Sequence, residues 1–263
     1  MSPEEPMQAR EQPDSSPRSP DAEPRAAQAT SDPVIVVAAR NEAASIGATL
    51  AALRERMPAA DLYVADDAST DATTSVASAH DARVVTGPSG RPTGKGANAT
   101  RGAELALAEA RGARERTFLL CDADLGASAA ELAELVAAVE GGECEIAIAR
   151  FARREGGGLG VALGYARRRI EELCGFRAMA PLSGQRAMPA SVLRELLPFA
   201  SGFGMELGIT VDAVRAGHRV SEIELPLEHR ATYRTPGGFL HRARQLRDIR
   251  RAARARRAAS RSG

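Results

Sequence analysis

The stretch Val34–Leu53, VIVVAARNEAASIGATLAAL, determines the expected fold. It opens with four consecutive β-branched residues, the pattern of a strand that is buried on both faces of a sheet. Ile46, Leu50 and Leu53 follow at helical spacing, and the polar segment Arg40–Glu42 separates the two patterns. A strand that passes directly into a helix is the first half of a crossover unit in a parallel sheet.

The same alternation continues along the chain. Further short strands are expected at 61–65, 83–85, 117–121, 144–149, 182–188 and 219–227. Helices are expected at 42–57, 70–79, 97–110, 128–139, 161–174, 190–197 and 203–216. Strands and helices that alternate at this pitch predict an α/β fold with a mainly parallel central sheet and helices on both faces.

The two ends of the chain differ from this middle part. Residues 1–33 hold seven of the 15 prolines and few large apolar side chains, so we expect a disordered tail. One domain is expected over residues 34–238. Residues 239–263 predict a basic helix with a weak apolar face, formed by Leu240, Leu246, Ile249 and Ala253. Such a helix either lies on anionic lipid or is a solvated helix end, and both interpretations remain open.

Charge and composition exclude several classes of protein. With 35 basic and 34 acidic residues, the formal net charge of +1 excludes a globally basic nucleic-acid-binding protein. No apolar run approaches the ~20 residues of a membrane-spanning helix, and residues 1–33 contain no apolar core of a signal peptide. The three cysteines have no CxxC spacing, which argues against a disulfide framework or a zinc site and favours a cytoplasmic location.

Carboxylates follow two of the expected buried strands at the point where each strand ends. Asp66 and Asp67 follow the strand at 61–65, and Asp122 and Asp124 follow the strand at 117–121. Ligands of open parallel sheets bind outside this edge, and clustered carboxylate oxygens favour Mg²⁺ or Mn²⁺. Aspartates at strand ends are also common helix caps and turn formers, but their joint placement favours a site.

Lys95 is the only lysine of the chain and lies between Gly94 and Gly96, where a long helix is expected to begin. Glycines permit close approach of the backbone, and the free amides of a helix start attract anions. Neither the P-loop pattern nor the Rossmann fingerprint is present. We interpret Lys95 as a phosphate contact, with an ordinary loop lysine as the alternative.

Four stretches resemble, in order, the successive motifs of family 2 glycosyltransferases, which use nucleotide sugars and have the GT-A fold: Val34–Leu53, Val64–Thr73 (VADDASTDAT), Gly94–Leu105 and Phe118–Leu125 (FLLCDADL). Three later stretches resemble the polyprenyl-phosphate or dolichyl-phosphate mannosyltransferase-like branch, and more distantly glucosyl-3-phosphoglycerate synthases: Leu182–Ala187 (LSGQRA), Gly204–Glu206 and Pro226–Arg230 (PLEHR). The sequence departs from the family at Ala38 and Ala68, where proline and glycine are usual.

The resemblance implies a role for each motif. Nucleotide-sugar binding is implied for Ala39, Arg40, Glu42, Asp67, Lys95 and Asp122. Asp67 would accept a hydrogen bond from uracil or guanine, and Lys95 would approach the diphosphate. Asp124 would bind the metal, and Asp122 would contact the ribose or the metal. His229, which follows an expected strand end, is a further candidate metal ligand or phosphate contact, with a structural histidine as the alternative. The metal, Mg²⁺ or Mn²⁺, would neutralise the charge that develops on the departing nucleotide.

The carboxyl-terminal half is expected to hold the acceptor. Glu206 completes the expected catalytic set with Asp122 and Asp124, either as a base toward an acceptor hydroxyl or as a group that only orients others. Acceptor binding is expected for Gln185, Arg186 and Arg230.

The expected function is metal-dependent transfer of a sugar from a UDP- or GDP-linked donor to polyprenyl phosphate, with inversion. The alternative keeps the site but has a small soluble anionic acceptor, as in phosphoglycerate glucosylation, with retention. A lipid-surface binding module and a phospho-acceptor receiver domain are non-enzyme alternatives. The chain would be cytoplasmic, with peripheral contact to anionic lipid at the inner face of the plasma membrane, and would bind no nucleic acid.

Overall fold

The computed structural model describes residues 32–87, 90–110, 115–152, 160–228 and 236–262. Its centre is a seven-stranded sheet with the order β3-β2-β1-β4-β6-β5-β7. The strands are β1 (Val34–Ala39), β2 (Asp61–Asp66), β3 (Arg83–Thr86), β4 (Thr117–Asp122), β5 (Ile146–Phe151), β6 (Arg186–Pro189) and β7 (Val220–Leu225). All neighbouring pairs are parallel except those of β6, which runs antiparallel to β4 and β5. The expected mainly parallel sheet is therefore confirmed.

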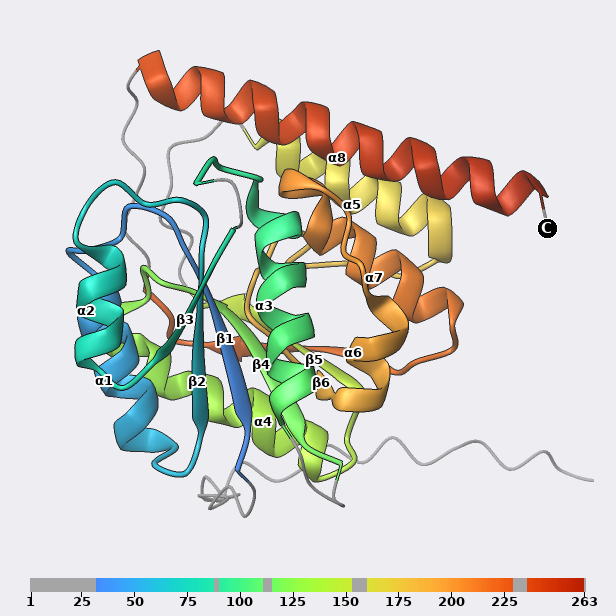
Figure 1. Cartoon of the computed structure of the whole chain (residues 1–263). Helices are drawn as coiled ribbons and strands as arrows, with labels where there is room; N and C mark the ends of the chain where they lie inside the picture. Colours follow the sequence, from blue (N-terminus) through green and yellow to red (C-terminus); the bar gives the residue numbers. More distant parts are fainter. Residues whose placement is uncertain (1–31, 88–89, 111–114, 153–159, 229–235, 263) are drawn as a thin grey trace, which may run out of the picture.

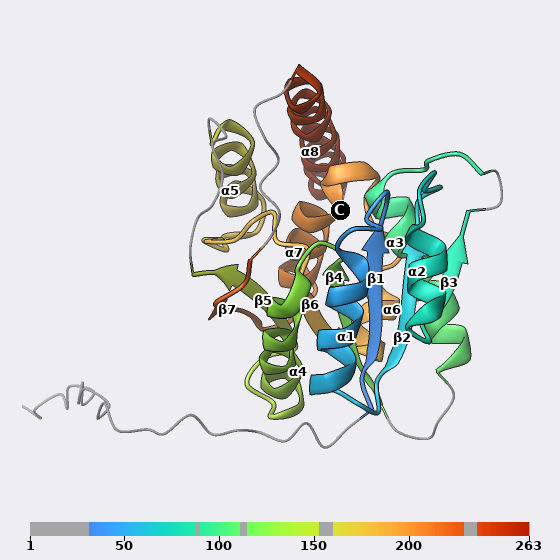
Figure 2. The same ribbon diagram turned by 90° about the vertical axis from the view of Figure 1, so that its left-hand side faces the viewer.

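Helices cover both faces of this sheet (Figures 1 and 2). One face packs against α1 (Ile46–Arg56), α2 (Thr73–Ala79), the 3₁₀ helix η1 (Gly126–Leu132) and α4 (Ala133–Glu140). The other packs against α3 (Lys95–Glu109), α6 (Ala190–Leu196) and α7 (Met205–Arg215). A third cluster joins α7 to α5 (Val161–Cys174) and α8 (Pro236–Ser262), outside the sheet layers.

The position of β1 in the sheet explains why residues 34–37 form a continuous apolar run. Ile35 and Val37 point into the core beneath α1, whereas Val34 and Val36 point into the core beneath α3. All four side chains are at most 1% exposed. A central strand that is covered on both faces needs apolar residues at every position, and not at alternate ones.

Two elements differ from the sequence-based expectation. The helix expected at 128–139 is divided into η1 and α4. The strand expected at 182–188 is shorter, because β6 begins only at Arg186. Ser183 and Gln185 bond to each other and to a neighbouring strand end through their side chains, so this segment forms a loop instead of extending the ladder.

The C-terminal helix belongs to the folded body, which corrects the interpretation of residues 239–263 as a separate tail. Its apolar residues Ile249, Ala252 and Ala253 are at most 6% exposed and pack against α5 and α7. Figure 1 shows α8 lying along these two helices. The apolar face that was expected to meet lipid or solvent is therefore used in internal packing. Within the described residues, no helix combines the length and the apolar character that crossing a membrane requires.

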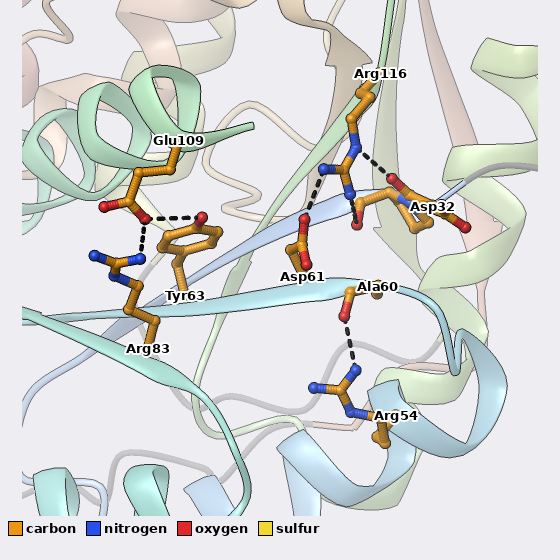
Figure 3. Close-up of polar contacts among 9 residues, drawn as sticks. Asp32, Arg54, Ala60, Asp61, Tyr63, Arg83, Glu109 and Arg116 are labelled. Carbon is orange, nitrogen blue, oxygen red and sulfur yellow. Dashed lines mark hydrogen bonds and ion pairs between the residues drawn. The ribbon is translucent and has the colours of Figure 1, made fainter. Parts of the chain in front are cut away.

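Polar groups near the amino-terminal ends of the strands are paired with one another (Figure 3). Arg116 donates to the carbonyl of Asp32 at 2.7 Å and forms an ion pair with Asp61 at 2.6 Å. Tyr63 donates to Glu109, and burial together with this hydrogen bond raises the pKa of Tyr63 to about 12. These contacts fasten β1, β2 and β4 to their neighbours at the edge opposite the acidic strand ends.

Gly102 allows α3 to lie directly on β1 and β2. A methyl group at this position would be 2.8 Å from Cβ of Ala65 and 2.9 Å from Cγ1 of Val36. We expect Gly102→Ala to lower the free energy of unfolding by about 1–3 kcal/mol, although alanine is the better helix former. Urea denaturation measures the change.

Gly164 in α5 provides the matched control, because a methyl group there would meet nothing within 4 Å. Gly164→Ala should raise the free energy of unfolding by about 0.5–1 kcal/mol. Equal effects of the two substitutions would contradict the close packing of α3 on the sheet.

Candidate active site

The carboxyl-terminal ends of β2, β1 and β4 lie side by side, as expected from the sequence. The amide of Asp67 donates to the carbonyl of Ala39 at 2.9 Å, and the amide of Ala123 donates to the carbonyl of Ala38 at 3.2 Å. The polar residues after these three strands are therefore brought to one edge of the sheet, which we call the carboxyl edge.

Lys95 is the centre of this edge. It begins α3, and its Nζ lies 2.7 Å from Oδ1 of Asp122 and 2.8 Å from Oε1 of Glu206. Glu206 lies in the first turn of α7 and is only 3% exposed. Burial lowers the pKa of Lys95, but the two carboxylates outweigh it, so that this pKa is raised above its ordinary value. The ammonium is therefore charged in the folded protein at neutral pH, and its ion pairs stabilise the fold there.

The loop before β6 closes against this network. Gln185 donates from Nε2 to Oδ2 of Asp122 at 3.0 Å, and Ser183 donates to Oε1 of Gln185 at 3.0 Å. A methyl group at Gly184 would be 2.7 Å from both Oδ2 of Asp122 and Nζ of Lys95. Only glycine fits without displacement, and both carboxylate oxygens of Asp122 have partners.

Asp67 orders the turn that leads into α3. Its carboxylate accepts hydrogen bonds from the amide of Thr93 at 2.6 Å and from the amide of Gly94 at 3.0 Å. Asp67 is 6% exposed. The aspartate after β2 thus holds the turn next to the lysine that pairs with the aspartate at the end of β4. The predicted contact with a base stays a prediction.

The neighbouring residues Asp66 and Ala68 show two irregularities. Oδ2 of Asp66 accepts from the amide of Ser69 at 3.0 Å, whereas its buried Oδ1 has no partner among the described residues. Ala68 has a φ of 56°, in the left-handed region that disfavours residues other than glycine. The usual glycine of the family fits this backbone better than the alanine of this chain.

The residues expected to line a nucleoside pocket flank this turn. Ala39 is buried, Arg40 is exposed and Glu42 is half-buried. The amide of Glu42 donates to Oγ1 of Thr73 at 2.8 Å, which ties the β1–α1 loop to the start of α2. Of the three residues, Ala39 directly contacts Asp67, whose amide donates to the carbonyl of Ala39. The nucleotide-binding role of all three stays a prediction.

Arg186 lies beneath the site. It is 0% exposed, donates to the carbonyl of Ser183 at 2.9 Å and donates to Oγ1 of Thr210 at 2.9 Å. Burial lowers its pKa to about 10, so it remains charged at neutral pH. The expected acceptor contact of Arg186 is corrected, because a side chain without exposed surface holds the 183–185 loop and α7 together and does not meet an acceptor.

The expected metal ligands are only partly described. Asp122 and Asp124 supply carboxylate oxygens two residues apart at the end of β4, the donor type that Mg²⁺ and Mn²⁺ prefer. The described residues include no group of three or more histidine, cysteine, aspartate or glutamate side chains placed to hold a metal. His229 and Arg230 lie outside the described residues.

Thr49 was missed by the sequence reasoning. This fully buried residue of α1 donates to the carbonyl of Ala123 at 2.9 Å and accepts from the amide of Gly126 at 2.9 Å. It thereby brackets the backbone on both sides of Asp124. The one available signal was a hydroxyl residue on the otherwise apolar face of the helix, next to Leu50.

Removal of the Lys95 ammonium leaves two carboxylates facing each other. We expect Lys95→Met to lower the free energy of unfolding at pH 7 by about 3 kcal/mol, as for other broken buried ion pairs. The control is Arg83→Met, which removes a pair with Glu109 whose arginine side chain is 61% exposed. That change should cost at most about 1 kcal/mol. Equal losses in urea denaturation would contradict the central role of Lys95.

Comparisons with known proteins identify the family and the fold of the chain. A family model described as "Glycosyl transferase family 2" matches residues 34–197. Glucosyl-3-phosphoglycerate synthase from Mycobacterium tuberculosis in complex with phosphoglyceric acid is 25% identical, with a TM-score of 0.70, over 87% of this chain and 81% of that chain. Its complex with Mn²⁺, UDP-glucose and phosphoglyceric acid is 26% identical, with a TM-score of 0.68, over 87% and 80%.

A further complex of that synthase, with Mg²⁺ and UDP, is 26% identical, with a TM-score of 0.67, over 87% and 80% of the two chains. No curated protein sequence matched the chain. The sheet order, the helices on both faces and the family match together describe the GT-A fold. The chain belongs to glycosyl transferase family 2 and is a glycosyltransferase.

Proposed function

We propose that the protein transfers glucose from UDP-glucose to a small anionic acceptor of the phosphoglycerate type. The observation that carries the proposal is the Lys95 ammonium, held at the carboxyl edge between Asp122 and Glu206. It is supported by the similarity to a synthase that was crystallised with Mn²⁺, UDP-glucose and phosphoglyceric acid. This similarity favours the small soluble acceptor over polyprenyl phosphate.

Lys95 would bind the diphosphate of the donor. A compact ammonium beside the free amides of a helix start suits a pyrophosphate, and its two carboxylate partners hold it in place. Asp67 would position Lys95 for the donor, because it holds the turn at 93–94 that precedes this lysine. Ala39, Arg40 and Glu42 would line the pocket of the nucleoside.

The carboxylate oxygens of Asp122 and Asp124 are ligands of the kind that divalent metals such as Mg²⁺ and Mn²⁺ prefer. Asp124 and Asp122, together with His229, would hold Mg²⁺ or Mn²⁺. When bound, the ion would stabilise the negative charge of the departing nucleotide as a Lewis acid. Asp124 is proposed as the principal carboxylate ligand because it is the second aspartate of the acidic pair that follows β4, and Asp122 would assist it.

Glu206 would orient Lys95. Its Oε1 already faces the ammonium at 2.8 Å, so the geometry supports a role in fixing the cation over a role as a free base. Arg230 would contact the acceptor. Gln185 is 2% exposed and would act on the site through its hydrogen bond to Asp122.

Metal-dependent donor binding tests the site. We expect Mn²⁺ with UDP-glucose to raise the melting temperature of the wild type more than either ligand alone, and UDP-sugars to exceed GDP- and TDP-sugars. Asp124→Asn should abolish the Mn²⁺-dependent part of this rise in melting temperature, since an amide is a weaker ligand for a hard cation than a carboxylate. The control is Asp81→Asn at an exposed turn, where asparagine tolerates the φ of 54°. Metal-independent UDP-glucose binding of equal strength would count against the proposal.

Polyprenyl phosphate remains a second candidate acceptor because of a cationic surface on α8. Arg247, Arg250, Arg251 and Arg254 line a hollow of about 430 Å³ on the exposed side of this helix, together with Ala243. We call these four arginines the arginine ridge. Arginines attract anionic lipid by about 1 kcal/mol each near a charged surface, which would bring a peripheral enzyme to a lipid-linked acceptor.

A single competition experiment separates the two acceptors. UDP-glucose and Mn²⁺ are incubated with 3-phosphoglycerate and with polyprenyl phosphate in phosphatidylglycerol vesicles. We expect a glucosylated phosphoglycerate, and no loss of this product when Arg247, Arg251 and Arg254 are changed together to glutamine. A glucosylated lipid, formed by the wild type and lost in the triple variant, would reverse the assignment. The control changes Arg83, Arg168 and Arg177, an equal charge loss elsewhere on the surface.

A further inference from the structure

The C-terminal helix carries one acidic side chain among nine arginines between residues 242 and 261. This residue, Asp248, pairs through Oδ1 with Arg247 of the arginine ridge at 3.3 Å, whereas its other oxygen, Oδ2, faces the body of the protein. Its side chain is 20% exposed, whereas that of the preceding Arg247 is 74% exposed. The single negative charge of the helix is therefore turned toward the body of the protein.

Asp248 lies directly on the turn at 200–204. Gly202 has a φ of +59°, and a methyl group there would be 2.2 Å from Oδ2 of Asp248. The amide of Phe203 points to the same oxygen at 3.5 Å, the long limit of a hydrogen bond. The carboxylate therefore packs directly against the left-handed glycine, and position 202 leaves no room for a side chain.

The opposite side of this turn rests on the start of α3. A methyl group at Gly96 would be 1.9 Å from the carbonyl oxygen of Ala200 and 3.3 Å from the amide nitrogen of Gly202. Gly96 directly follows Lys95. The turn is therefore enclosed between Asp248 on one side and the helix that carries Lys95 on the other.

The same turn leads directly into the helix that carries Glu206. Gly202–Gly204 form the 3₁₀ helix η2, and α7 begins at Met205. Neither segment has a side-chain cap at its own N-terminal flanking residue, Ser201 or Gly204. Amide groups at a helix start favour a negative charge nearby, and Asp248 supplies one from another element.

We propose that Asp248 is a positioning residue: from α8 it caps the η2–α7 segment and so sets Glu206 against Lys95. The effect on the site passes through backbone, since the carboxylate itself touches Gly202 and Phe203. The activity readout of this inference rests on the proposed function, whereas its structural readout does not.

A second anchor between α8 and α7 provides a matched control. Arg256 pairs with Asp212 through two of its guanidinium nitrogens, Nε and Nη2, with Nε 2.8 Å from Oδ1. This contact joins α8 to α7 itself, at Asp212, and does not involve the turn at 200–204. Arg256→Gln should loosen the docking of α8 and leave the turn at 200–204 in place.

The test combines hydrogen exchange with kinetics for Asp248→Ala, Asp248→Asn and Arg256→Gln. In Asp248→Ala we expect amide exchange of residues 200–207 to accelerate about fivefold, the usual consequence of a lost cap. We expect kcat to fall about tenfold, with KM for UDP-glucose within about twofold, because a misplaced group at the reacting centre costs rate. Asp248→Asn keeps an acceptor oxygen and should recover most of both losses.

Arg256→Gln should lower the melting temperature at least as much as Asp248→Ala does. Amide exchange at 200–207 and kcat should nevertheless stay close to those of the wild type. The inference is overturned if exchange at 200–207 is unchanged in Asp248→Ala, or if Arg256→Gln lowers kcat by the same factor. If the wild type transfers no glucose to any acceptor, the proposed function fails, and the exchange experiment alone decides the capping role of Asp248.

Discussion

One ammonium group held between two carboxylates organises the functional edge of this protein. Lys95 joins the end of β4, through Asp122, to the start of α7, through Glu206. Glu206 is buried, whereas Lys95 and Asp122 are half-buried, and a buried charge is tolerated in a fold only when it has a partner. The surrounding segments follow from this requirement. Asp67 fixes the turn before the lysine, and Gly184 leaves room for the ion pair. The side-chain amide of Gln185 donates to the second carboxylate oxygen of Asp122.

The sequence predicts the part of the site that depends on the regular alternation of strands and helices. Buried apolar runs indicate the strands, and the acidic residues that follow them meet at the carboxyl edge because parallel neighbours end together. The sequence does not show which partner each charge takes. The pairing of Lys95 with Glu206 depends on how α7 approaches α3, over more than a hundred residues of chain. Arg186 is the opposite case: an arginine in an expected acceptor motif is buried. Its Nε and Nη1 donate to Ser183 and Thr210 inside the fold, whereas its buried Nη2 has no partner among the described residues.

The C-terminal helix shows how an arginine-rich segment can be integral to a fold. Hydropathy alone suggested an exposed tail, since its apolar side chains are few and mostly small. Small residues are sufficient here because the facing turn and helix are also glycine-rich: a methyl group at Gly204 would be 2.6 Å from Cβ of Ala252. Close backbone approach replaces large side chains as the source of packing. The charges are sorted accordingly, with the ridge outside and Asp248, Ile249 and Arg256 inside.

The singular lysine has a practical consequence. Arginine supplies every other basic side chain of the chain, so an amine-selective reagent can modify only Lys95 and the α-amino group. Reductive methylation with isotopically labelled formaldehyde would therefore install a single side-chain reporter, located between Asp122 and Glu206. Its chemical shift would follow electrostatic changes at the carboxyl edge without any mutation, and its rate of labelling would measure how often the ion pairs open.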